Sequence, residues 1–136
     1  MSGELILVVE DNDKNRKLVR DLLQYSGYRT LEAETAAQGL ALAEARSPQL
    51  ILLDVQLPDM DGLAALRQLK ADPRTASIPV VALTAFAMRE DRARFLEAGF
   101  DGYLPKPIDP RAFPGQVGAL IGAAPGQPAD TAGSLP

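Results

Sequence analysis

Apolar runs of strand length alternate along the chain with segments in which apolar residues recur at helical spacing. The runs Leu5 to Val9, Leu50 to Leu53 and Ile78 to Leu83 are almost wholly apolar, as expected of strands buried on both faces of a parallel sheet. Tyr28 to Ala33 is half polar, which indicates a strand at the sheet edge, and Gly102 to Pro105 is a short last strand. This alternation predicts an α/β fold built from repeated βα units.

Turn and capping residues place the helices between these strands. Gly27 ends the first helical segment, and Thr35 is a candidate N-cap of the second. Asp72 precedes a proline, which disfavours helical geometry at the residue before it, so the third helix is expected to end there. A fourth helix, from Met88 to Ala98, carries many charges and few large apolar residues. We therefore expect this helix to pack loosely.

The C-terminal part of the chain is less regular. Asp109 and the proline after it predict the start of a fifth helix. Pro114, Gly115 and Gly118 weaken that helix, which we expect to be kinked, frayed or short. Residues 122–136 are mainly glycine, proline, alanine and small polar residues, which cannot bury enough apolar surface to become ordered. We predict one domain over residues 1–121 and a flexible tail over residues 122–136.

Composition narrows the possible chemistry. The chain is 46% hydrophobic but only 5% aromatic, so its core must be aliphatic. It contains no cysteine and no histidine, which excludes disulfides, thiolate nucleophiles, the usual zinc sites and imidazole bases. With 14 basic and 18 acidic residues and no basic block, nucleic acid is not an expected partner. Because neither a signal peptide nor a membrane-spanning run is evident, we expect a cytoplasmic protein.

Candidate functional residues follow the predicted strands. In an open parallel sheet, such residues gather at the carboxyl ends of the strands. Glu10 and Asp11 follow the first strand, Asp54 the third, Thr84 the fourth and Lys106 the fifth. Carboxylates that lie close together raise one another's pKa unless a cation compensates them, and magnesium prefers oxygen ligands. We therefore predict a magnesium site in which Asp54, after the central strand, acts as a nucleophile toward a phosphoryl group.

Each of these residues also has an ordinary structural explanation. Glu10 and Asp11 could belong to a helix cap, Asp54 to a turn, Thr84 to a strand, and Lys106 could be a solvated charge. Their occurrence together, in order and at the same end of neighbouring strands, favours a functional cluster. The nearby residues not tied to the cluster are interpreted as turn, cap or packing residues: Asp59, Met60, Asp61, Gly62 and Met88.

Five segments are more specific than the separate residues. They are Val9 to Asn12, Ile51 to Asp54, Leu57 to Gly62, Pro79 to Ala85 and Tyr103 to Pro107. In this combination the chain resembles the receiver domains of two-component response regulators. The resemblance extends from about Leu5 to Ile121, and within the family it is greatest to stand-alone DivK-like and CheY-like regulators.

The resemblance implies a flavodoxin-like three-layer fold with a doubly wound sheet of five parallel strands in the order 2-1-3-4-5. It also implies a partner, either a sensor histidine kinase or a phosphotransfer protein, that donates a phosphoryl group to Asp54. Glu10, Asp11 and Asp54 would bind Mg²⁺ together with the backbone carbonyl of Gln56. The receiver itself would catalyse only this transfer and its own dephosphorylation, so we do not expect a metabolic enzyme.

The remaining roles concern the response to phosphorylation. By the resemblance, Thr84 and Lys106 would bind the phosphoryl group, and Thr84 and Tyr103 would switch the surface of the fourth helix, fifth strand and fifth helix toward a downstream protein. A bulky Phe86 would shield the phosphate, which predicts a long-lived phosphorylated state. The bond between Lys106 and Pro107 is expected to be cis. The irregular fifth helix favours a monomer or a weak dimer.

Several alternatives stay open at this point. The chain could be a stand-alone regulator, which we favour, or the N-terminal receiver of a larger response regulator. An aspartyl-phosphate phosphohydrolase would usually carry a second acid two residues after the nucleophile, where this chain has Gln56. Flavin binding would need a phosphate-cradling loop, which an acidic segment after the first strand does not provide. A non-phosphorylated interaction module is the last alternative.

Overall fold

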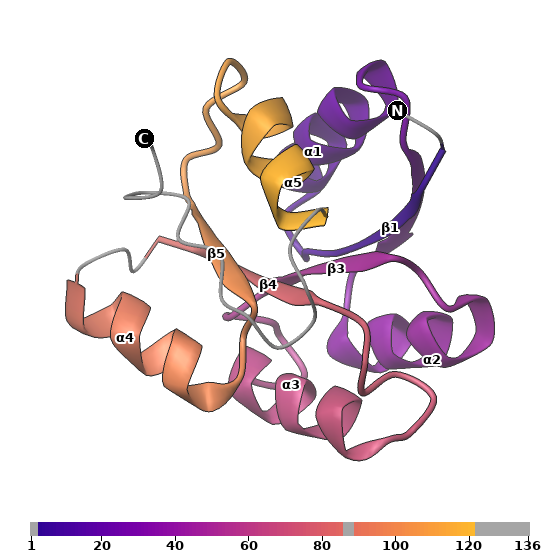
Figure 1. Cartoon of the computed structure of the whole chain (residues 1–136), viewed down its shortest axis with the longest axis vertical. Coiled ribbons are helices and arrows are strands. Elements are labelled where there is room, and N and C mark those ends of the chain that lie inside the picture. The colour runs from indigo at the N-terminus through magenta and orange to yellow at the C-terminus, as the bar shows by residue number, and fades with distance from the viewer. Residues whose placement is uncertain (1–2, 86–88, 122–136) are drawn as a thin grey trace.

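A single parallel sheet organises the chain in the computed structural model, which describes residues 3–85 and 89–121 (Figure 1). The strand order is β2-β1-β3-β4-β5, so the predicted order 2-1-3-4-5 is confirmed. The strands are β1 (Leu5–Val9), β2 (Arg29–Ala33), β3 (Leu50–Asp54), β4 (Val80–Thr84) and β5 (Gly102–Pro105). The helices between them are α1 (Asp13–Tyr25), α2 (Ala36–Arg46), α3 (Gly62–Ala71), α4 (Arg89–Ala98) and α5 (Phe113–Ile121).

Helices cover both faces of the sheet, giving three layers (Figure 1). Successive side chains of a strand point to opposite faces. Ile6 and Val8 of β1 therefore pack with buried residues of α1 and α5. Leu7 and Val9 pack on the other face with buried residues of α2, α3 and α4. Because β1, β3 and β4 are buried along their whole lengths, the sheet centre is a rigid platform for the residues that follow these strands.

Local sequence accounts for most helix ends. Asn12 is the N-cap of α1, and its side chain accepts a hydrogen bond from the Asn15 backbone N–H. Thr35 caps α2 as predicted, and Asp61 caps α3 by accepting from the backbone N–H groups of its first turn. Gly27 follows α1 with a φ of 94°, a left-handed conformation that glycine adopts without strain. The hydrogen bonds that Asp61 accepts at the start of α3 confirm the cap role predicted for it.

The fourth strand begins later than the sequence predicted. Its apolar run starts at Ile78, but β4 starts at Val80. Pro79 has no N–H to donate to a neighbouring strand, although its carbonyl accepts a bond of 3.0 Å from Ile51 N. Pro79 can therefore accept a hydrogen bond from β3 but cannot donate one, and the regular strand begins at the residue after it.

The start predicted for the fifth helix is wrong by three residues. Asp109 and Pro110 initiate a turn, and the helix itself begins at Phe113, whose N–H donates to the Asp109 carbonyl over 2.9 Å. Pro114 consequently lies in the first turn, where a missing N–H leaves no intrahelical bond unmade. The helix is only 9 residues long, as expected, and Val117 is among the residues that anchor it.

The fourth helix is weakly anchored, in agreement with its charged sequence. Among its described side chains, at residues 90–98, only Phe95 is buried. The Phe95 ring meets the Phe100 ring edge-on, with 5.9 Å between centroids. Phe86 and the predicted tail of residues 122–136 lie outside the described residues. Within the part of the chain that is described, no helix has the length and apolar character needed to cross a bilayer.

Candidate functional site

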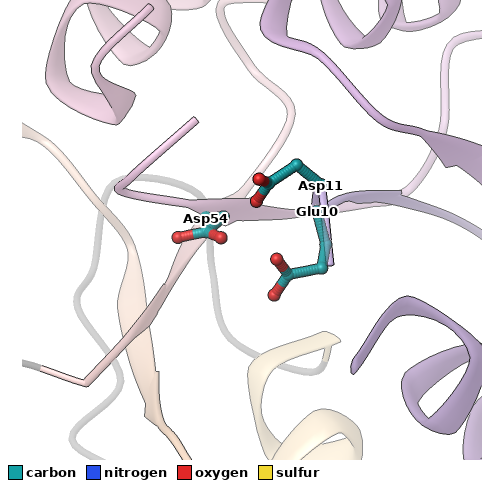
Figure 2. A group of neighbouring side chains, drawn as sticks. All are labelled: Glu10, Asp11 and Asp54. Carbon is teal, nitrogen blue, oxygen red and sulfur yellow. The ribbon is translucent and has the colours of Figure 1, made fainter. Parts of the chain in front are cut away.

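The pairing of strands brings distant polar residues to one edge of the sheet. β1 and β3 lie side by side with Val9 opposite Leu53, so Glu10 and Asp54 are the next residues on neighbouring strands. Asp11 follows Glu10 directly. Figure 2 shows the three carboxylates gathered at this edge. The acidic cluster predicted from the sequence is thus present in the fold.

Lys106 joins this cluster from β5. Thr84 at the end of β4 lies opposite Pro105, which places Lys106 just beyond the strand. Its Nζ lies 2.7 Å from Glu10 Oε1 and 3.0 Å from Asp54 Oδ2. Glu10 is 1% exposed and Asp54 3% exposed, so one ammonium compensates two carboxylates that are shielded from water. The peptide bond from Lys106 to Pro107 is cis, as expected.

The two buried carboxylates are also held by the backbone. Asp54 Oδ1 accepts a hydrogen bond of 2.9 Å from Gln56 N, and Glu10 Oε2 accepts one of 3.1 Å from Asn12 N. The remaining oxygen of Glu10, Oε1, forms the close ion pair with Lys106 Nζ. Backbone N–H groups and one ammonium thus hold both buried carboxylates in place.

Burial and charge shift the pKa values of this cluster. Burial, followed by the neighbouring Asp54, raises the pKa of Glu10 to about 7, although Lys106 and the Asn12 N–H partly oppose the rise. Burial lowers the pKa of Lys106, but the hydrogen bonds and charges of Glu10 and Asp54 outweigh it and the net shift is upward. Lys106 therefore stays charged, and the acidic cluster still carries more negative than positive charge when its carboxylates are ionised.

The carboxylates have the chemistry of a site for a hard dication. Oxygens of Glu10, Asp11 and Asp54 all lie within 4.8 Å of one another. Asp11 is exposed while the other two are buried, so an ion here would face both protein and solvent. Mg²⁺ keeps several waters and takes few protein carboxylates, which this half-open arrangement suits. The donor set of three carboxylates therefore fits Mg²⁺.

The other predicted residues surround this cluster. Thr84 is buried at the end of β4, and the Tyr103 ring is buried in the middle of β5. The guanidinium carbon of Arg92 in α4 lies 5.5 Å from the centroid of the Tyr103 ring, a cation–π distance. Gln56 contributes its N–H to Asp54, and a role of its carbonyl in binding metal stays a prediction.

Two residues near the site were not predicted from the sequence. Arg16 Nη1 donates to the backbone carbonyl of Glu10 over 2.9 Å. Asp59, interpreted as a turn residue, instead accepts bonds of 2.9 and 3.0 Å from Ala36 N and Ala37 N at the start of α2. Arg16 lies one turn after the N-cap of α1, and this spacing along the chain is a local signal that its side chain can reach back to the residues before the helix. No local signal points from Asp59 to α2, because the contact spans more than 20 residues.

Comparison with known proteins gives a consistent result. Residues 6–117 match the family model described as response regulator receiver domain. The chain is 41% identical over 119 residues to the polar-differentiation response regulator DivK of Brucella ovis, covering 88% of this chain and 97% of the relative. The same identity and coverage apply to DivK of Brucella abortus strain S19.

Solved structures agree with these relatives. The receiver domain of a sensor histidine kinase from Pseudomonas aeruginosa, determined with a magnesium ion coordinated in its active site cleft, has a TM-score of 0.81 at 34% identity. That match covers 90% of this chain and 100% of the other. A CheY-like receiver domain protein from Methanospirillum hungatei has a TM-score of 0.78 at 30% identity, covering 88% of this chain and 94% of its own.

Proposed function

This chain belongs to the response regulator receiver domain family, and we propose that Asp54 is the residue on which it accepts a phosphoryl group. The observation that supports this proposal most directly is the pairing of buried Asp54 with Lys106 beside two further carboxylates. Asp54 is the carboxylate of this cluster that ends the central strand, β3. Its position there lets groups from both neighbouring strands act on one transferred group.

In the proposed reaction an oxygen of Asp54 forms a bond to phosphorus while the bond from phosphorus to the donor atom breaks. The electron pair of that bond stays with the donor. Before transfer Asp54 Oδ2 is paired with Lys106, whose ammonium lies close enough to pair with a phosphoryl oxygen afterwards. The N–H of Gln56 holds Oδ1 and so restricts rotation of the carboxylate.

Glu10, Asp11 and Asp54, with the backbone carbonyl of Gln56, would hold Mg²⁺. When bound, the ion supplies positive charge that neutralises the carboxylates and the incoming phosphoryl oxygens. Thr84, at the end of the neighbouring strand, would donate its hydroxyl to the transferred group. We further propose that Thr84 and Tyr103 carry the resulting change to the surface of α4, β5 and α5, where a downstream protein binds.

The phosphoryl donor is proposed to be a sensor histidine kinase or a phosphotransfer protein. The chain contains no histidine of its own, so a donor imidazole would have to come from a partner. The proposal also includes a cytoplasmic location, a receiver domain over residues 1–121 and a monomer or weak dimer. It places the chain among signalling proteins rather than enzymes of metabolism, whether it acts alone or as part of a larger regulator.

Incubation with acetyl phosphate and Mg²⁺ tests the proposal. Wild-type protein should gain the mass of one phosphoryl group in an intact-mass spectrum, and Asp54→Asn should gain none. Asp61→Asn is the matched control, because this exposed carboxylate lies in the same loop and asparagine preserves its capping role. Labelling of Asp54→Asn to the wild-type level would contradict the assignment. Sustained hydrolysis of a phosphate ester by wild-type protein would instead support a phosphohydrolase.

A further inference from the structure

Arg16 connects three parts of the fold beside the acidic cluster. Its Nη1 donates to the Glu10 carbonyl over 2.9 Å, and its Nη2 donates to Asp13 Oδ1 over 2.6 Å. Its Nε lies 3.3 Å from Glu32 Oε1 on β2. The side chain is only 13% exposed, so these contacts are made at a partly buried position and not by a freely moving surface arginine. The planar guanidinium allows all three at once.

The carbonyl that Arg16 holds belongs to the peptide group between Glu10 and Asp11. The orientation of this peptide determines the direction in which the two neighbouring side chains leave the backbone. The N–H of Glu10 is bonded to Ala33 O over 3.0 Å, but the carbonyl lies beyond the last residue of β1. Arg16 therefore restrains the peptide group that connects Glu10 to the next carboxylate, Asp11.

We infer that Arg16 is a positioning residue for the metal site, which sets Mg²⁺ affinity by fixing the peptide between Glu10 and Asp11. This inference rests on the proposed function, since it concerns the same site. Arg16 does not touch the metal or the transferred group. It acts through the backbone, so its effect is on the geometry that the carboxylates have before the ion binds, and hence on the free energy of binding the ion.

The charge of Arg16 would have the opposite effect. A cation near a magnesium site repels the ion, so removal of the charge alone would strengthen binding. Arg16→Lys separates the two effects, because lysine keeps the charge but has a single ammonium that cannot make the three planar contacts. Arg20 provides a matched control on the same helix: it lies 3.7 Å from Glu32 Oε2.

The test is titration of metal-free protein with MgCl₂ by isothermal calorimetry. Arg16→Lys should bind Mg²⁺ about tenfold more weakly than wild type, and Arg16→Gln should also bind more weakly, by a smaller factor, because it loses the repelling charge as well. Arg20→Lys should stay within about twofold, because the ion pairs of Arg20 with Asp21 and Glu32 are partly exposed and the backbone carbonyl of Glu10 is held by Arg16 instead. Urea unfolding in the presence of a chelator identifies any variant that does not fold. A purely structural role would lower the free energy of unfolding without changing the Kd of the folded protein.

Three results would overturn the inference: a wild-type Kd for Arg16→Lys, tighter binding by Arg16→Gln, or an equal loss in Arg20→Lys. Labelling with acetyl phosphate separates this inference from the proposed function. If wild-type protein binds Mg²⁺ but is not labelled on Asp54, the proposed function fails and the role of Arg16 in binding metal is unaffected. If wild-type protein is labelled and Arg16→Lys binds Mg²⁺ normally, only the role of Arg16 fails.

Discussion

The most unusual single residue is Glu10, a carboxyl that is buried and whose pKa is raised. Its neighbours in the fold are Lys106, which favours the charged form, and Asp54, which disfavours it. Because burial and Asp54 together prevail, Glu10 holds a proton more tightly in the folded than in the unfolded chain. Stability associated with this proton is complete below a pH of about 4.5 and is lost as the pH rises through about 7.

The substitution Glu10→Gln tests this directly. In metal-free protein the neutral side chain avoids the cost of an ionised, buried carboxyl, so the variant should gain stability relative to wild type as the pH rises. We expect a relative gain of about 1 to 3 kcal/mol between roughly pH 5 and pH 8. Urea unfolding at each pH measures it.

Saturating Mg²⁺ serves as the internal control for Glu10→Gln. A bound dication stabilises the ionised form of a nearby carboxylate, so the pH dependence of the wild-type protein should become smaller when the metal is present. A difference between variant and wild type that is the same at every pH would show that burial does not raise the pKa of Glu10.

At the scale of elements, the start of α3 determines how the loop after Asp54 is held. Gly62 is the first residue of α3, and a Cβ added to it would lie 2.6 Å from Val55 Cα and 2.8 Å from the Asp54 carbonyl oxygen. Both of those atoms are backbone, which cannot move aside as a flexible side chain would. The helix can therefore approach the end of β3 only because this residue is glycine.

Gly62→Ala should consequently lower the free energy of unfolding by about 1 to 3 kcal/mol. It should also weaken Mg²⁺ binding, since the displaced backbone belongs to Asp54 and to Val55 directly after it. Gly115→Ala in α5 is the control: nothing lies within 4 Å of its added Cβ. That substitution should instead stabilise the protein by about 0.5 to 1 kcal/mol. Urea unfolding and calorimetric titration measure both effects, and equal stability of the two variants would refute this explanation of Gly62.

For the whole molecule, the charged residues at the two ends of the parallel strands differ in how well their charges are balanced. The carboxyl edge, where β1 and β3 end, carries the acidic cluster, in which carboxylates outnumber the one ammonium and the pKa of Glu10 is raised. The opposite edge carries a compensated pair, in which Asp101 Oδ2 accepts from Val80 N over 2.8 Å and from Lys70 Nζ over 3.1 Å. The first edge is suited to binding a cation, whereas the second joins β4, β5 and α3 to one another.

Asp101→Ala should therefore reduce stability without affecting the metal site. The Val80 N–H would lose its side-chain acceptor, which should cost about 1 to 3 kcal/mol in urea unfolding. Asp101→Asn, which keeps an acceptor oxygen, should cost less. The Mg²⁺ Kd of both folded variants should match that of wild type, and a marked change in Kd would show that the two edges are coupled.

Much of the molecule followed from local patterns. The apolar runs placed the strands to within two residues, and the half-polar sequence of β2 placed it at the sheet edge, as observed. The start of α5 was wrong, since capping by Asp109 stabilises a turn as well as a helix. The closeness of Glu10, Asp54 and Lys106 was predictable from parallel topology, because the carboxyl ends of parallel strands meet at one edge.

The sequence by itself thus determined the strands, most helix ends and the set of residues that gather at the carboxyl edge, because period, caps and strand direction are local properties. Only the tertiary structure decided that Lys106 lies between two carboxylates, that Arg16 holds the Glu10 carbonyl and that Asp59 accepts from the first backbone N–H groups of α2. Those contacts depend on distances between elements. Packing of the two helical layers sets these distances, and no spacing along the chain encodes them.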